Sequence, residues 1–136
     1  MPSQSQPEQG HRLSLRILDS AEYIHHSLGP NHTDEYYRRA MKNMLSRQNI
    51  SVESLFPVDV WQNQELVDLY FLDLFIEHQI IVQVKSAWWP FSNEEIDEMA
   101  EYVFASDSQA GLLINFGRRR LEYKWVAPYQ SLDYDD

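Results

Sequence analysis

Three polar side chains interrupt a segment that otherwise has the composition of two apolar strands. The segment from Tyr70 to Ser86, YFLDLFIEHQIIVQVKS, carries Asp73, Gln83 and Lys85. Carboxylate and amide oxygens bind hard cations such as Mg²⁺, although the uncharged amide is the weaker ligand. A lysine beside such a cation offsets negative charge that develops at a phosphate. These residue types could therefore hold a cation beside an anionic group, provided that the fold brings them together.

The turn between the two strands decides whether the three polar residues meet. A turn centred on His78 places Asp73 opposite Gln83, on the same face as Lys85. A two-residue turn at His78 and Gln79 would instead pair Asp73 with Val84 and divide the polar group between the two faces. We favour the first register, because polar groups on an apolar face can then satisfy one another. A structural ion pair of Asp73 and Lys85 at a sheet edge is the alternative.

The rest of the sequence predicts the elements that would hold this hairpin. Helical spacing of apolar residues predicts helices over 14–28 and 33–48, and the SNEE sequence at Ser92–Glu95 matches a capping box that opens a third. Patterns of period two predict six strands, over 52–55, 58–62, 66–76, 80–86, 111–116 and 121–126. The expected fold class is α/β (α+β), a mixed β-sheet flanked by helices in the order ααββββαββ.

Length and composition limit the organisation of the chain. The 136 residues suit a single domain over residues 12–128, after a flexible leader over 1–11 and before an acidic tail over 129–136. With no cysteine, neither a disulfide nor a cysteine-bound zinc ion is expected. The sequence has no apolar run long enough to span a bilayer and no secretory signal, so we expect a cytoplasmic or otherwise intracellular protein without a membrane partner.

Charge and aromatic residues indicate the kind of partner. The net charge of −10 disfavours nucleic acid, which is bound largely through lysine and arginine. The only dense basic cluster is GRRR, with Arg118, Arg119 and Arg120, which either contacts phosphate or forms a solvated turn. In SAWWPF, Trp88 and Trp89 could stack on bases, bind a protein or cover the core. The acidic tail suits a basic protein partner.

Four segments together resemble a known family. They are HHSLGP (25–30), NHTDEYY (31–37), LDLFIEHQIIVQVKS (72–86) and GLLINFGRRRLEYKWV (111–126). Over Leu15 to Pro128 the chain resembles the small GxxExxY proteins, a branch of the PD-(D/E)XK nuclease-like superfamily. The resemblance implies a restriction-endonuclease-like fold and, in active members, a site for a divalent metal ion, usually Mg²⁺.

The resemblance also implies roles for individual residues. The first metal-binding acid would be Asp73, and Lys85 would position the attacking water. Gln83 stands where the second metal-binding acid is expected. Asp34 replaces the glutamate of the GxxExxY motif, and Glu98 occupies a position that is often glutamine.

Two hypotheses follow. The first is a degenerate nuclease-like domain without a cofactor, which serves as an interaction module or complex subunit and binds a protein partner or another copy of itself. The second is a Mg²⁺-dependent nuclease with a rearranged site, in which Asp73, Glu98 and Asp34 bind the metal, Gln83 adds a neutral oxygen, and Lys85 lies beside the water. Whether the protein is an enzyme stays open at this point.

Overall fold

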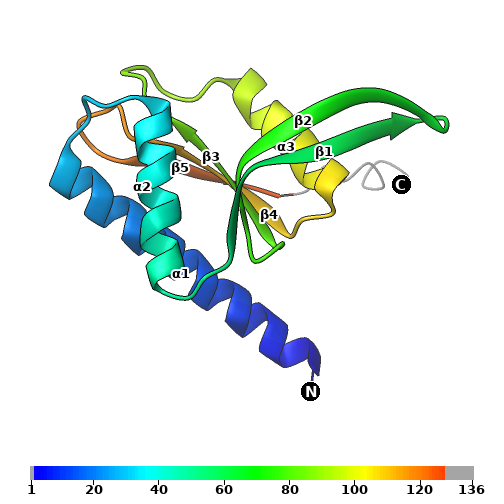
Figure 1. The fold of residues 1–136 in the computed structure, drawn as a ribbon, viewed down its shortest axis with the longest axis horizontal. Coiled ribbons are helices and arrows are strands. Elements are labelled where there is room, and N and C mark those ends of the chain that lie inside the picture. The colour runs from blue at the N-terminus through cyan, green and yellow to red at the C-terminus, as the bar shows by residue number, and fades with distance from the viewer. Residues whose placement is uncertain (1, 128–136) are drawn as a thin grey trace.

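The computed structural model describes residues 2–127, and Figure 1 shows its elements. Eight helices and strands follow one another in the order ααβββαββ. They are α1 (Pro2–Leu28), α2 (Asp34–Arg47), β1 (Val52–Gln62), β2 (Glu65–Ile76), β3 (Ile80–Lys85), α3 (Asn93–Ser106), β4 (Ala110–Asn115) and β5 (Glu122–Val126). The five strands form one mixed sheet in the order β1-β2-β3-β4-β5, in which only β3 and β4 are parallel. The predicted fold class, a mixed sheet flanked by helices, is confirmed.

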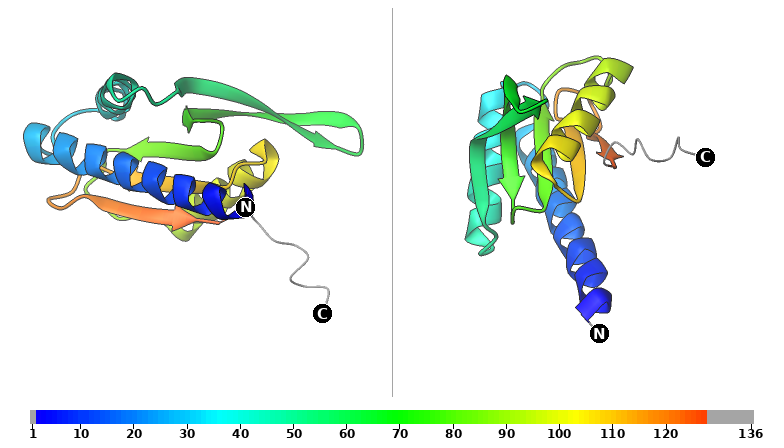
Figure 2. Two further views of the ribbon diagram at one scale, coloured as in Figure 1. Left: turned by 90° about the horizontal axis from the view of Figure 1, so that it is seen from below. Right: turned by 90° about the vertical axis from the view of Figure 1, so that its right-hand side faces the viewer.

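The sheet separates two apolar cores. Helices α1 and α2 cover one face and α3 covers the other, as the end-on view in Figure 2 shows. Strand β3 serves both cores because its side chains alternate: Val82 packs with α1 and α2, and Ile81 packs with α3. By the same alternation, Gln83 and Lys85 lie on the α3 face.

Local capping sets where two of the helices begin. Thr33 accepts a hydrogen bond from the backbone N–H of Tyr36 at the start of α2, as its residue type predicts. Ser92 and Glu95 form the predicted capping box at the start of α3. That box fixes the residue at which α3 begins, and therefore which of its residues share the face that packs on the sheet.

Two expected strands are one. The sequence predicted a break between 55 and 58, but β1 runs unbroken from Val52 to Gln62 and contains Pro57. Since β1 is an edge strand, the missing N–H of a proline can be tolerated there. Leu55 adopts a positive φ of 55°, so the strand is irregular near the expected break without ending.

The N-terminal segment differs from the expected leader, and the C-terminal segment lies outside the described residues. Helix α1 begins at Pro2, so the segment predicted as a leader over 1–11 is helical from residue 2 onward. Its glutamine and glutamate residues are compatible with a helix, and the helical pattern after residue 12 can extend through them. The predicted acidic tail, 129–136, lies outside the described residues. No helix within residues 2–127 has the length and apolar character needed to cross a membrane.

Candidate functional site

The β2–β3 hairpin has the register that its polar residues predicted. Leu74 pairs with Val82 and Ile76 with Ile80, so the turn is centred on His78. Continuing this register places Asp73 opposite Gln83. The positive φ angles of Glu77 and His78 make the tight connection.

At Asp73 and Gln83, strands β2 and β3 are joined by hydrogen bonds between side chains and the backbone. The backbone N–H of Asp73 donates to Oε1 of Gln83 at 2.6 Å, and the N–H of Val84 donates to Oδ2 of Asp73 at 2.8 Å. Burial raises the pKa of the Asp73 carboxyl, the bond from Val84 and the charge of Arg38 lower it, and the net effect is a raised pKa. The side chains of Asp73 and Gln83, the two hairpin residues expected to bind a metal ion, are thus hydrogen-bonded within the hairpin.

Lys85 is held by the carboxylate of Glu95, a residue expected only in the capping box of α3. Its Nζ lies 2.8 and 3.0 Å from the two carboxylate oxygens of Glu95, in the first turn of α3. The ammonium group also lies 5.0 Å from the ring centroid of Phe91 and 5.6 Å from that of Trp89. Burial works against ionisation of Glu95, but the hydrogen bond from Lys85 and those from Ser92 outweigh it and lower the pKa of Glu95.

The two remaining predicted acids also have partners of their own. Oδ1 of Asp34 accepts a hydrogen bond of 2.7 Å from the backbone N–H of Ser86, which ties the start of α2 to the end of β3. Glu98 lies beside Tyr102 on α3. Burial, followed by the charge of Glu98 and a hydrogen bond with it, raises the pKa of Tyr102 to about 12.

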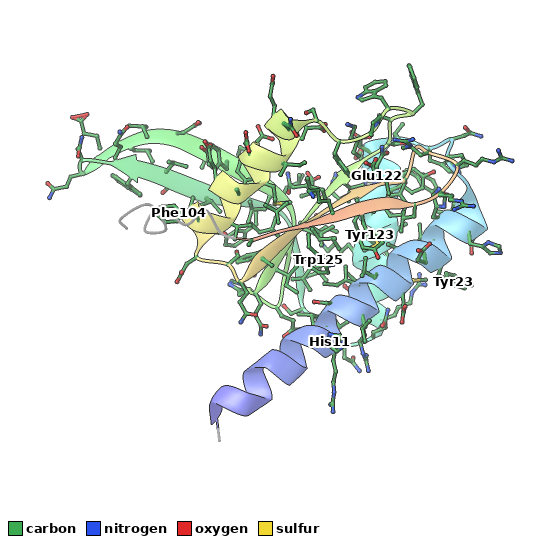
Figure 3. The ribbon with its side chains drawn as sticks, turned by 180° about the vertical axis from the view of Figure 1, so that it is seen from behind. His11, Tyr23, Phe104, Glu122, Tyr123 and Trp125 are labelled. Carbon is green, nitrogen blue, oxygen red and sulfur yellow. The ribbon has the colours of Figure 1, made fainter. Side chains whose placement is uncertain are left out.

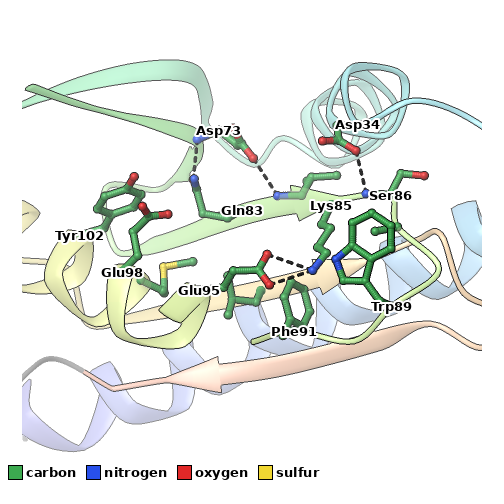
Figure 4. A pocket seen from close by; sticks show the side chains of 14 residues that line it. Asp34, Asp73, Gln83, Lys85, Ser86, Trp89, Phe91, Glu95, Glu98 and Tyr102 are labelled. Atoms are coloured by element: carbon green, nitrogen blue, oxygen red, sulfur yellow. Dashed lines mark hydrogen bonds and ion pairs between the residues drawn. The ribbon is translucent and has the colours of Figure 1, made fainter. Parts of the chain in front are cut away.

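The acids described above, together with Gln83, Lys85 and Tyr102, line a single cavity between β3 and α3. It has a volume of about 480 Å³ and is shown in Figure 4. Of the residues singled out from the sequence, it brings together six: Asp34, Asp73, Gln83, Lys85, Trp89 and Glu98. Four carboxylates and one ammonium group face it, since Glu95 also contributes to the lining. A phosphate would therefore meet a net negative site unless a cation accompanied it.

The donor set does not fit a three-ligand metal site. Within residues 2–127, no group of three histidine, aspartate or glutamate side chains lies where it could hold one metal ion. The three acids of the rearranged-site hypothesis, Asp34, Asp73 and Glu98, share the cavity without converging on one cation. Across the hairpin, the side chain that faces Asp73 is the amide of Gln83, which carries no charge and bonds to the backbone N–H of Asp73.

A second cavity holds the other predicted binding residues. Trp88 and the GRRR segment, with Arg118, Arg119 and Arg120, line a separate space of about 450 Å³. The two tryptophans therefore face different cavities, Trp89 the first and Trp88 the second.

Asn115 at the end of β4 fixes the loop that carries both tryptophans. This side chain is fully buried. Its Oδ1 accepts hydrogen bonds from the N–H groups of Ala87 and Gly117, and its Nδ2 donates to the carbonyl of Trp89 and to Glu122. One amide thus supports the walls of both cavities. His25 is also buried, and its Nε2 bonds to the carbonyl of Arg118 in the same region.

Glu95 was expected only in the capping box and not among the site residues. The signal was present in the helix spacing. Glu95, Glu98 and Tyr102 follow one another at intervals of three and four, which places them on one face of a helix. Glu98 was already expected to face the site, so Glu95 one turn before it could have been included.

Comparison with known proteins finds similarity to one superfamily and to one solved structure. A family model described as PD-(D/E)XK nuclease superfamily matches residues 11–126. The crystal structure of SSO0001 superposes with a TM-score of 0.57 at 11% sequence identity, over 74% of this chain and 53% of that chain. An identity this low shows a shared fold alone, and the present chain spans about half of that protein's length. No curated protein matches the chain.

Proposed function

The chain belongs to the PD-(D/E)XK nuclease superfamily, whose members typically use a divalent metal ion, and from this premise we propose that it retains the nuclease fold as an interaction module, or subunit of a complex, with a degenerate catalytic site. Its segments favour the GxxExxY branch of the superfamily. The partner would be a protein, and no metal cofactor would be required.

One observation carries the proposal: Gln83, an uncharged amide, stands where the resemblance to the GxxExxY proteins implies a metal-binding carboxylate. Oε1 of Gln83 accepts the hydrogen bond from the N–H of Asp73, so the side chain performs a structural task that needs no charge. Replacing a ligating carboxylate by an amide removes one negative charge, and hard cations such as Mg²⁺ depend strongly on ligand charge. Lys85, the residue that would act at the phosphate, is paired with Glu95.

A second candidate function rests on the shared cavity. Asp73, Glu98 and Lys85 all line it, so a nuclease with only two carboxylate ligands is the alternative. It would require Glu98 to leave Tyr102 and approach Asp73.

Calorimetry with Mg²⁺ and Mn²⁺ distinguishes the two functions. We expect the natural sequence to bind neither ion at micromolar concentration, and Gln83→Glu to bind at least tenfold more tightly, because glutamate can keep the bond to Asp73 and add a charged oxygen. Gln109→Glu, an exposed substitution with the same change in charge, is the matched control and should leave binding unchanged. Micromolar binding by the natural sequence that Asp73→Ala abolishes would contradict the proposal and favour the nuclease.

A further inference from the structure

The β1–β2 hairpin continues far beyond the sheet to which it belongs. Strand β2 pairs with β3 only over Leu74–Ile76, whereas its pairing with β1 continues to Gln62 and Glu65 at the tip. Residues 57–71, here called the arm, therefore form a two-stranded ribbon with no third strand. Figures 1 and 2 show the arm projecting away from the helices and the rest of the sheet.

Only the base of the arm is anchored. Val58 and Leu72, the residue next to the arm, are buried in the core beneath α3. Tyr70 packs its ring 4.5 Å from that of Tyr102, and its hydroxyl donates to Glu101 at 3.3 Å. Beyond this contact, every residue from 61 to 69 is exposed. The outer arm thus has no support from the remainder of the described chain.

The exposed arm is apolar on both faces. Side chains alternate along a strand, so Val67, Leu69 and Phe71 lie on one face. Leu66 lies on the other, opposite Trp61 in the neighbouring strand. The five side chains are between 45% and 61% exposed. An isolated two-stranded hairpin is marginally stable in water, and clustered exposed apolar groups mark interaction sites.

The charge of the arm indicates which kind of partner would bind it. Residues 48–77 contain six acidic residues and no lysine, arginine or histidine. Three of these acids, Asp59, Glu65 and Asp68, belong to the arm and are exposed. Cationic groups beside apolar ones would complement this surface, because opposite charges at the rim guide association while apolar contacts provide most of the affinity.

Two occupants from this protein itself fit poorly. Residues 128–136 contain three aspartates and no basic residue, so their charge repels the arm. A second copy would bring a net charge of −10 against another −10, and a large net charge of one sign opposes self-association.

We propose that the arm is a docking surface for a separate, basic and apolar protein segment. Such a segment would bury Trp61 and Leu66 on one face and Leu69 on the other, with its lysine or arginine side chains near Asp59 and Glu65. The inference rests on the proposed role as an interaction module and names the surface that performs it, which is distinct from the cavity at Lys85.

Fluorescence anisotropy with defined peptides tests the proposal. The probe is a labelled peptide of alternating lysine and valine, with a glutamate–valine peptide and a lysine–serine peptide as controls for charge and for apolar character. The full chain should bind the lysine–valine peptide at least tenfold more tightly than either control. Equal binding of the lysine–serine peptide would overturn the role of the apolar faces, and absence of binding would overturn the proposal itself.

Paired variants locate the binding on the arm. Trp61→Thr/Leu69→Thr keeps strand-forming residues and should weaken binding at least tenfold. The matched control is Tyr23→Gln/Tyr123→Thr, whose side chains are similarly exposed and lie away from the hairpin, as Figure 3 shows. For charge, Asp59→Asn/Glu65→Gln should weaken binding at low salt, whereas Asp19→Asn/Glu22→Gln on α1 should not. Equal loss in an arm variant and its control would contradict the assignment.

Analytical sedimentation of the natural sequence and of Trp61→Thr/Leu69→Thr gives the oligomeric state of each. It thereby distinguishes binding of a basic partner from self-association through the arm. A monomer in both cases agrees with a basic partner. A dimer that the arm variant dissociates would overturn the proposal in favour of a second copy. Since neither measurement involves a metal ion, failure here leaves the calorimetric test of the degenerate site intact, and the reverse also holds.

Discussion

Burial of the Asp73 carboxylate in the cavity wall lowers the stability of the folded protein at neutral pH. This carboxylate is largely removed from solvent and accepts a hydrogen bond from Val84, yet burial keeps its pKa above the ordinary value. A raised pKa in the folded state means that folding favours the protonated form. The contribution of Asp73 to the free energy of unfolding is therefore most favourable below the unfolded pKa of about 3.9. It is lost as the pH rises through the pKa of Asp73 in the folded protein.

Asp73→Asn is therefore expected to stabilise the protein at neutral pH. The amide can still accept from Val84, while the buried charge is gone. We expect the free energy of unfolding in urea to rise at pH 7.5 by an amount on the order of 0.5–1 kcal/mol, the size of a typical polar substitution, with no gain at pH 3.5. Asp19→Asn, at an exposed position, should change neither value. Destabilisation at pH 7.5 would mean that the hydrogen bond from Val84 to the carboxylate outweighs the cost of burying its charge.

At the scale of elements, the β4–β5 connection packs directly on the segment that leaves β3. The N–H of Phe116 donates to the carbonyl of Lys85 at 2.8 Å, and Asn115 accepts from Ala87. A Cβ atom added at Gly117 would lie 2.2 Å from the backbone nitrogen of Ala87. Because backbone rather than a flexible side chain is in the way, one segment would have to move.

Gly117→Ala should accordingly lower the free energy of unfolding by about 2–4 kcal/mol, as overpacking and loss of buried hydrogen bonds do. Tryptophan fluorescence should change too, because Trp88 and Trp89 lie on the displaced loop. Gly29→Ala provides the comparison: φ is +74° but nothing lies within 4 Å, so only the backbone preference is lost, at about 1 kcal/mol. Equal costs at the two glycines would contradict the close packing.

On the scale of the whole molecule, stability is expected to be uneven. The central strands β3 and β4 are buried between α1 and α2 on one side and α3 on the other, whereas the outer arm has water on both faces. Local opening requires little free energy where few apolar contacts are lost.

Native-state hydrogen exchange should reveal this division. Amides of Ile81 to Val84 and of Leu112 to Ile114 should exchange slowest, near the rate set by global unfolding. Hydrogen-bonded amides of the arm, between Trp61 and Leu69, should exchange at least ~100-fold faster. Saturating lysine–valine peptide should slow the arm amides selectively. Arm amides as slow as those of β3 in the free protein would contradict the description of the arm as an unsupported ribbon.

The sequence by itself determined the features that depend on near neighbours. Thr33 and Ser92 mark the starts of α2 and α3, because a capping side chain bonds to its own helix. The hairpin register followed from Asp73 and Gln83, since only a turn centred on His78 lets those polar groups meet. Local hydrogen bonding and alternation were sufficient for these assignments.

Only the tertiary structure decided what depends on segments far apart in the chain. Two strands were expected over 52–55 and 58–62, but β1 is continuous, and its place at the sheet edge removes the need for an N–H at Pro57. Glu95 was not expected at Lys85, and it is the crossing of α3 over the sheet that brings its carboxylate to the ammonium group. The arm's apolar residues had the pattern of core strands, and their exposure follows from where β3 stops pairing with β2. Each outcome depends on the relative placement of elements, which composition and spacing do not contain.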